Sequence, residues 1–193
     1  MTSIYNIFFT LIIYFSLSTI LKAQEAGATL YTGLINGKLH QKMTCDQCNF
    51  QSGYTIGLDG RLNSGGLFFL ISGDFIKFDL LPINKIDYFS KEKMTLLKLK
   101  AGMGFKIISF SKEVFLSSKI QLVFSSIYDY NQELLFESGL QVNDGFLGAT
   151  SGLMLNYKAL IFELEFEKGL LNMFYEMPQT KTDFITLKTG FKF

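Results

Sequence analysis

Apolar and polar positions alternate with a period of two residues over several segments of the chain. In residues 160–171, large apolar side chains occupy most even positions, whereas the odd positions include Glu163, Glu165 and Glu167. Residues 183–193 alternate in the same way, and their polar face contains Lys188 and Lys192. Because successive side chains point to opposite sides of a β-strand, these segments are predicted to be strands with one apolar and one charged face.

The order of such segments predicts a closed barrel. Eight strands are predicted, at residues 27–36, 53–62, 66–75, 94–108, 113–125, 145–157, 160–171 and 183–193. The connections alternate in length, with long ones after the first, third, fifth and seventh strands. Outer-membrane barrels have short periplasmic turns and longer extracellular loops. We therefore predict an all-β fold, an eight-stranded antiparallel up-and-down transmembrane β-barrel with both ends of the chain on the periplasmic side.

The charged faces of the predicted strands are expected to line the barrel interior. A Lys or Arg facing lipid near the bilayer centre costs about 2–4 kcal/mol, and eight strands leave room inside for side chains but for no open channel. Buried ions need partners, so we predict an interior ion-pair network, with Asp74 as a further member. Three clustered carboxylates could instead bind a cation, and two could do acid–base chemistry. The predicted network comprises Asp59, Arg61, Lys98, Lys100, Lys106, Lys119, Glu163, Glu165, Glu167, Lys188 and Lys192.

Contacts from the glutamates to Lys188 and Lys192 are expected first, because the last two strands are neighbours. Inward-facing glycines are expected to make space for the long side chains. These glycines are Gly57, Gly102, Gly104, Gly152 and Gly190.

Aromatic residues near the ends of the predicted strands are expected to form girdles at the two membrane interfaces. Aromatic residues make up 16% of the chain, with 17 Gly and 2 Pro, a composition that favours paired strands and tight turns over helices. The alternative is ordinary core packing in a soluble barrel. The girdle candidates are Tyr31, Tyr54, Phe110, Phe124, Tyr157, Phe174 and Phe193.

The first 23 residues differ from the rest of the chain. Residues 4–21 are nearly all apolar or small and carry no charge, and Ala23 offers a small residue for cleavage. This pattern predicts a signal peptide at residues 1–23 and a barrel domain at residues 24–193; the alternative is an uncleaved membrane anchor. Without Lys22, the 18 basic residues of the chain fall to 17, which equals the number of acidic residues. The chain has no excess of basic residues, so no nucleic-acid partner is expected.

Cys45 and Cys48 form a C-x-x-C motif in the first long connection. Such a motif can close a small disulfide ring, bind metal with help from His40 and Asp46, or cycle redox equivalents. We expect the disulfide, because an exported protein passes through an oxidising compartment, a second ligand pair for zinc is missing, and no βαβ context surrounds the motif. His40 is the single histidine, so no Ser–His–Asp site is expected, and we predict no enzymatic activity, metal site or cofactor.

Five segments resemble the PorT-like family of eight-stranded outer-membrane β-barrels and, more distantly, OmpA-type barrels. The resemblance implies an outer-membrane location in a Gram-negative cell, contact with outer-membrane lipid, and insertion by the barrel-assembly machinery, for which Phe193 would be the recognised end. It implies no catalytic residues. The matching segments are residues 31–34, 96–102, 152–157, 163–170 and 190–193.

Together these patterns predict a small outer-membrane barrel with a closed, ion-paired interior. Its extracellular loops would have a structural or recognition role toward a protein, glycan or lipid in the envelope or outside the cell. The alternative is an accessory component of an outer-membrane protein-secretion machine. A membrane-embedded hydrolase or acyltransferase would need clustered catalytic side chains near the outer rim, and a soluble lipocalin-like carrier would need an apolar interior.

Overall fold

The computed structural model describes residues 25–40, 51–64, 66–79, 93–129, 143, 145–173 and 181–193. The eight predicted strands are confirmed. β1, β3 and β5 each run four residues further toward the long connections than predicted, because strand pairing continues there without strict alternation. Among the described residues, no helix is long and apolar enough to cross a bilayer. The strands are β1 (Glu25–His40), β2 (Gln51–Ser64), β3 (Leu67–Asp79), β4 (Lys93–Ser109), β5 (Val114–Asp129), β6 (Gly145–Tyr157), β7 (Leu160–Gly169) and β8 (Lys181–Lys192).

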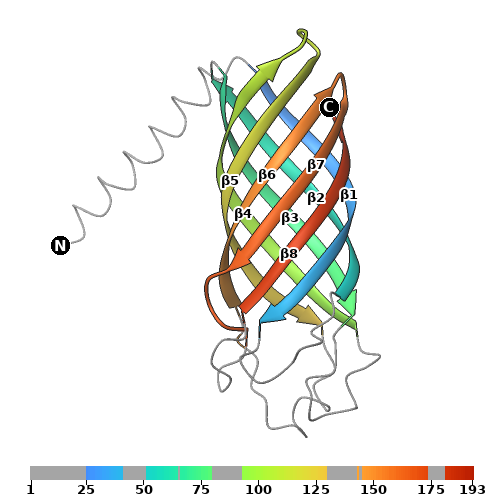
Figure 1. The fold of residues 1–193 in the computed structure, drawn as a ribbon, viewed down its shortest axis with the longest axis vertical. Coiled ribbons are helices and arrows are strands. Elements are labelled where there is room, and N and C mark those ends of the chain that lie inside the picture. Colours follow the sequence, from blue (N-terminus) through green and yellow to red (C-terminus); the bar gives the residue numbers. More distant parts are fainter. Residues whose placement is uncertain are drawn as a thin grey trace, which may run out of the picture.

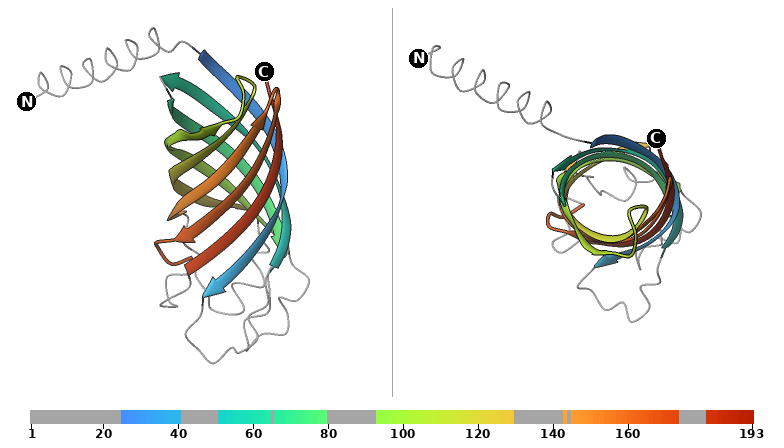
Figure 2. Two further views of the ribbon diagram at one scale, coloured as in Figure 1. Left: turned by 45° about the horizontal axis from the view of Figure 1, so that its top comes forward. Right: turned by 90° about the horizontal axis from the view of Figure 1, so that it is seen from above.

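Each strand pairs antiparallel with the next one in sequence, and β8 pairs with β1 to close the barrel (Figures 1 and 2). The strands are staggered and tilted, as closure of a sheet requires. A path through paired residues that starts at Ala28 returns, after one circuit, to Lys38 of the same strand. The intermediate residues of this path are Gly60, Ile71, Ala101, Leu122, Ala149, Lys168 and Asp183.

The short turns and the last residue of the chain lie at one end of the barrel (Figure 1). Gly66 has a positive φ of 100° in the β2–β3 turn, and Lys158 has a φ of 53° in the β6–β7 turn. In the β4–β5 turn, the backbone N–H groups of Glu113 and Val114 donate to the Ser111 hydroxyl, at 3.3 and 3.1 Å. We call this the short-turn end, and the opposite end, where the long connections begin, the long-connection end.

The outside of the barrel is apolar along most of its length. Leu34 and Ile71 are each 70% exposed, and large apolar side chains occupy outward positions on all eight strands. A closed barrel satisfies its backbone hydrogen bonds internally, which is the condition for crossing lipid with strands. The apolar outside therefore faces the membrane, and buried side chains fill the inside.

The inside of the barrel is layered along its axis, as the inward side chains of β3 show. Phe68 and Leu70 come first at the short-turn end, Ser72 and Asp74 follow in the middle, and Ile76 and Phe78 lie toward the long-connection end. Phe68 and Leu70 belong to an apolar cluster with Met154 and Ile161. The other apolar layer consists of Ile35, Ile76, Phe78, Met94, Leu96, Val123, Phe146, Met173 and Phe184.

Candidate functional site

Between the two apolar layers lies a group of buried ionisable side chains, which we call the charged layer. It contains five acidic and five basic residues, all at most 5% exposed. Each faces inward, because the alternate strand positions that carry the charged side chains face the lumen. Its members are Asp59, Asp74, Glu163, Glu165, Glu167, Arg61, Lys98, Lys100, Lys119 and Lys188.

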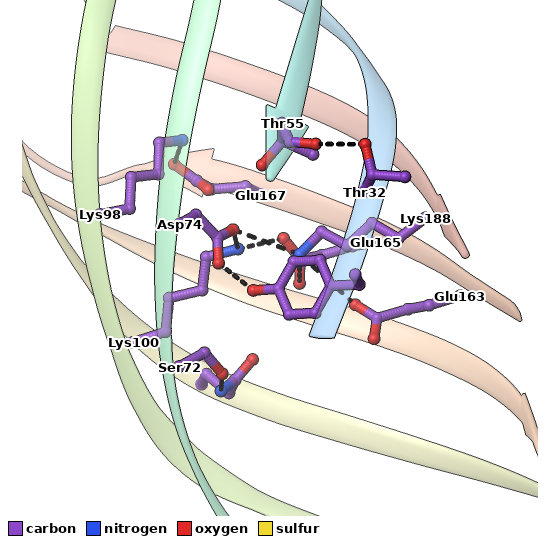
Figure 3. Close-up of polar contacts among 12 residues, drawn as sticks. Thr32, Thr55, Ser72, Asp74, Lys98, Lys100, Glu163, Glu165, Glu167 and Lys188 are labelled. Atoms are coloured by element: carbon purple, nitrogen blue, oxygen red, sulfur yellow. Dashed lines mark hydrogen bonds and ion pairs between the residues drawn. The ribbon is translucent and has the colours of Figure 1, made fainter. Parts of the chain in front are cut away.

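Glu165 of β7 lies at the centre of the charged layer (Figure 3). Its carboxylate contacts the ammonium groups of Lys100, Lys119 and Lys188, the last two at 2.9 and 3.1 Å. Asp74 of β3 shares two of these partners, since its Oδ2 lies 2.8 Å from Lys100 Nζ and 3.3 Å from Lys188 Nζ. Two carboxylates and two shared ammonium groups thus join β3, β4, β7 and β8 across the lumen.

Two further glutamates extend the layer along β7. Glu163 Oε1 lies 2.7 Å from Lys119 Nζ and 3.7 Å from Lys188 Nζ. Glu167 Oε1 lies 2.6 Å from Lys98 Nζ. The Lys98 ammonium also lies 3.8 Å from the centroid of the Phe184 ring, where the charged layer meets the apolar layer at the long-connection end. Each of the three glutamates predicted on one face of β7 therefore has a lysine partner.

Tyr31 lies inside the barrel, so the prediction that it belongs to an interfacial girdle is wrong. Its side chain is 5% exposed, and its hydroxyl donates a hydrogen bond to Asp74 Oδ1. Two glycines make room for the ring, because a Cβ atom at Gly57 would lie 2.6 Å from Tyr31 Cζ and one at Gly190 would lie 3.0 Å from Tyr31 Cβ. Nearness to a strand end suggested a girdle, but the parity of β1 points this side chain inward.

The remaining girdle candidates lie mostly on the outside. Phe174 lies outside the described residues. The side chains of the other five are 47–69% exposed. They are Tyr54, Phe110, Phe124, Tyr157 and Phe193.

Lys106 is exposed, so the prediction that it lies in the interior is wrong. The pairing of β3 with β4 ends at Leu67 and Phe105, and a β-bulge follows between Lys106 and Ile108. Lys106 therefore lies beyond the wall that would enclose it. Lys192 is half-buried beside Gly27 and lies past Leu160, the first residue of β7, which places it away from the glutamates of that strand.

Arg61 and Asp59 of β2 lie on the short-turn side of the layer. Arg61 Nη1 donates to Asn156 Oδ1 at 3.3 Å, and its guanidinium carbon lies 4.6 Å from the centroid of the Phe68 ring. Sequence reasoning missed Asn156, which also donates to the Ser117 hydroxyl at 3.1 Å. The sequence did contain a signal for Asn156, because it is a polar residue at an inward-facing position of β6.

The motif of Cys45 and Cys48 lies outside the described residues, and its disulfide stays a prediction. A lower mass of the unreduced protein, by its two thiol hydrogens, would verify it. Within the described ranges, no group of three His, Cys, Asp or Glu residues is placed to hold a metal ion. The side chains of the charged layer can thus neutralise and orient one another; their ammonium partners occupy the carboxylates that a cation would need.

No protein-family model matches the chain, and no curated protein matches it. Solved structures resemble it in fold. One is Neisserial surface protein A (NspA), with a TM-score of 0.55 and 10% identity over 88% of this chain and 100% of that one. Another is Ail, the attachment invasion locus protein of Yersinia pestis, with a TM-score of 0.52 and 13% identity over 88% of this chain and 100% of that one. A third is Ail in complex with the heparin analogue sucrose octasulfate, with a TM-score of 0.52 and 12% identity over the same shares.

These similarities are to the fold. The chain forms a closed, eight-stranded antiparallel barrel of the outer-membrane type, with an apolar belt outside and charged side chains inside. Such a barrel resides in the outer membrane, which confirms the predicted location.

Proposed function

We propose that the protein is a non-conducting outer-membrane barrel that holds its four long connections at the cell surface for recognition. The observation that carries this proposal is the sealed charged layer. Ten ionisable side chains are packed across the lumen, none of them more than 5% exposed, and buried apolar side chains lie toward both ends. Among the described residues, side chains therefore fill the lumen, whereas a hydrated pathway for ions or solutes would need open space between them.

The charged layer gives this barrel a rigid centre. Ion pairs that cross the lumen, such as Lys98–Glu167 between β4 and β7, connect strands that are not neighbours in the sheet. Buried pairs of this kind are costly to break, because one partner is left as an uncompensated charge. The interior therefore fixes the positions of the strand ends from which the long connections start.

The charge of the long connections indicates the chemistry of a partner. Residues 41–50, 80–92, 130–142, 144 and 174–180 carry seven acidic and three basic side chains. Ail is described in complex with a heparin analogue, a polyanion. The acidic excess of this chain favours a neutral or cationic partner, such as a basic protein surface, because like charges oppose binding.

Two finer assignments belong to the same proposal. Membership of the PorT-like family rests on the sequence segments that resemble it, among them residues 96–102 and 163–170. The alternative role, as an accessory component of a protein-secretion machine, has no specific support among the described residues. We propose the recognition role first, and no catalytic role, because the buried acids of the lumen are held by lysine partners.

Two measurements test the proposal. The purified barrel in a planar bilayer should give no steady conductance, and a reproducible open channel would refute the closed lumen. A variant in which short turns replace residues 80–92 and 130–142 should keep the barrel but lose adhesion of expressing cells to a positively charged protein surface. Undiminished adhesion by that variant would refute the recognition role, and blocked protein export in a deletion strain would favour the secretion alternative.

A further inference from the structure

The short-turn end carries a second group of charged side chains, which is separate from the charged layer. It contains the exposed or half-buried lysines Lys106, Lys112, Lys158 and Lys192, together with Glu113 of the β4–β5 turn. We call these four lysines the basic rim. Glu113 Oε2 lies 4.0 Å from Lys158 Nζ, and both side chains are more than 60% exposed. Glu25, the first residue of β1, is a second acidic residue at this end, so the four lysines outnumber the glutamates by two.

The backbone of this end forms a continuous, ordered arc. The N–H of Lys158 donates to the carbonyl of Glu113 at 2.9 Å, which joins the β6–β7 turn to the β4–β5 turn. The N–H of Lys192 donates to the carbonyl of Ala159 at 2.7 Å, and Phe193 exchanges two hydrogen bonds with Ala28. Since the turns are tied together, their lysines lie along the same rim of the barrel.

An aromatic ring lies beside each of two of these ammonium groups. Lys106 Nζ lies 4.5 Å from the centroid of the Phe115 ring, and Lys158 Nζ lies 6.0 Å from that of the Tyr157 ring. Tyr157 is 48% exposed at the end of β6. Aromatic residues at strand ends mark the headgroup level of a bilayer. The Lys158 ammonium group is thus held at the level of phospholipid phosphates, whereas Phe115, beside Lys106, is at an inward position of β5.

The β4–β5 hairpin adds an apolar surface beside the lysines. The β-bulge after Lys106 leaves both Ile107 and Ile108 exposed, at 44% and 49%, and Phe110 in the turn is 68% exposed. This hairpin reaches beyond the β2–β3 turn at the short-turn end (Figure 1). Apolar side chains next to lysines suit a surface whose acyl chains lie beside its phosphates.

We propose that the basic rim binds anionic phospholipid in the periplasmic leaflet of the outer membrane. The lysines contact the phosphates, and Ile107, Ile108 and Phe110 contact the adjoining acyl chains. A soluble acidic protein would fit the lysines alone, whereas a lipid surface accounts for the lysines, the aromatic rings and the apolar hairpin together. The inference is independent of the role of the long connections.

Native mass spectrometry of the purified full chain tests this proposal. The protein is released from micelles that contain equal amounts of phosphatidylglycerol and phosphatidylcholine, and the retained lipids are counted. Each lysine near an anionic surface contributes about a fivefold change in binding, so we expect a preference for phosphatidylglycerol of at least about tenfold. Equal retention of both lipids would overturn the proposal.

Two triple variants with equal loss of charge locate the site. Lys106→Gln/Lys112→Gln/Lys158→Gln should abolish the preference. Lys77→Gln/Lys168→Gln/Lys181→Gln, at outward positions near the long-connection end, should retain it. Equal losses in both variants would assign the effect to net charge and refute a site. Faster migration of the unboiled protein than of the boiled protein on a detergent gel verifies that each variant is folded. Lys112→Gln alone, in an exposed turn, should still reduce the preference about threefold to fivefold.

Discussion

Replacing Glu165 with Gln removes the central charge of the barrel interior while it keeps the size of the side chain. The wild-type carboxylate contacts three ammonium groups, those of Lys100, Lys119 and Lys188, and is about 1% exposed. After the substitution, the charged layer would hold five cations and four carboxylates. Removal of one member of a buried ion pair destabilises a protein by about 3–5 kcal/mol. We expect a loss at the upper part of this range, because three cations lose a partner.

The assay is urea unfolding of the barrel in lipid vesicles, compared with a surface control. Glu113→Gln breaks an exposed pair with Lys158 at 4.0 Å, and such pairs contribute at most about 1 kcal/mol. A second comparison is the double variant Glu165→Gln/Lys119→Met, which restores the charge balance. Its loss should be smaller than the sum of the single losses by about 0.5–3 kcal/mol. A loss for Glu165→Gln no larger than that for Glu113→Gln, or strict additivity in the double variant, would refute the role of the charged layer.

Three further substitutions test other parts of the structure by the same unfolding assay. Tyr31→Phe removes the hydrogen bond to the Asp74 carboxylate and should destabilise the barrel by about 1.5–3 kcal/mol; no measurable change would show that this bond is unimportant. Gly104→Ala should destabilise by about 1–3 kcal/mol, because its Cβ would clash with the Phe68 ring, whereas Gly73→Ala meets nothing within 4 Å and should be nearly neutral. Leu122→Lys places a charge on the lipid face, at a position 67% exposed, and should destabilise by about 2–4 kcal/mol, so a neutral result would contradict the assignment of that face to lipid.

The strands and their lipid-facing sides could be predicted from the same pattern. An alternation with a period of two identifies a strand, and its apolar positions identify the side that faces lipid. Glu163, Glu165 and Glu167 share one parity, and a membrane leaves such a face only the interior. The prediction was less complete where both faces are apolar. Met94 and Leu96 of β4 are buried inside, but they are apolar like the outward-facing residues of the same strand. The alternation therefore does not reveal which side they face, and the apolar layer at the long-connection end could not be predicted.

The partners of the charged side chains could be predicted only in part. Contacts between β7 and β8, such as Glu165 with Lys188, follow from adjacency in sequence. The contact of Glu167 with Lys98 crosses the lumen and depends on the stagger of the strands, which is set by the whole circuit of pairings. Lys106 was placed inside because its parity is correct, but the neighbouring strand ends before it.

The most direct test of the closed transmembrane barrel is its gel mobility after isolation from outer membranes, with and without boiling in detergent. A closed barrel with a buried ion-pair layer should stay folded in cold detergent and migrate faster than the boiled chain. A single position before and after boiling, with the protein recovered in the soluble fraction, would contradict the transmembrane barrel.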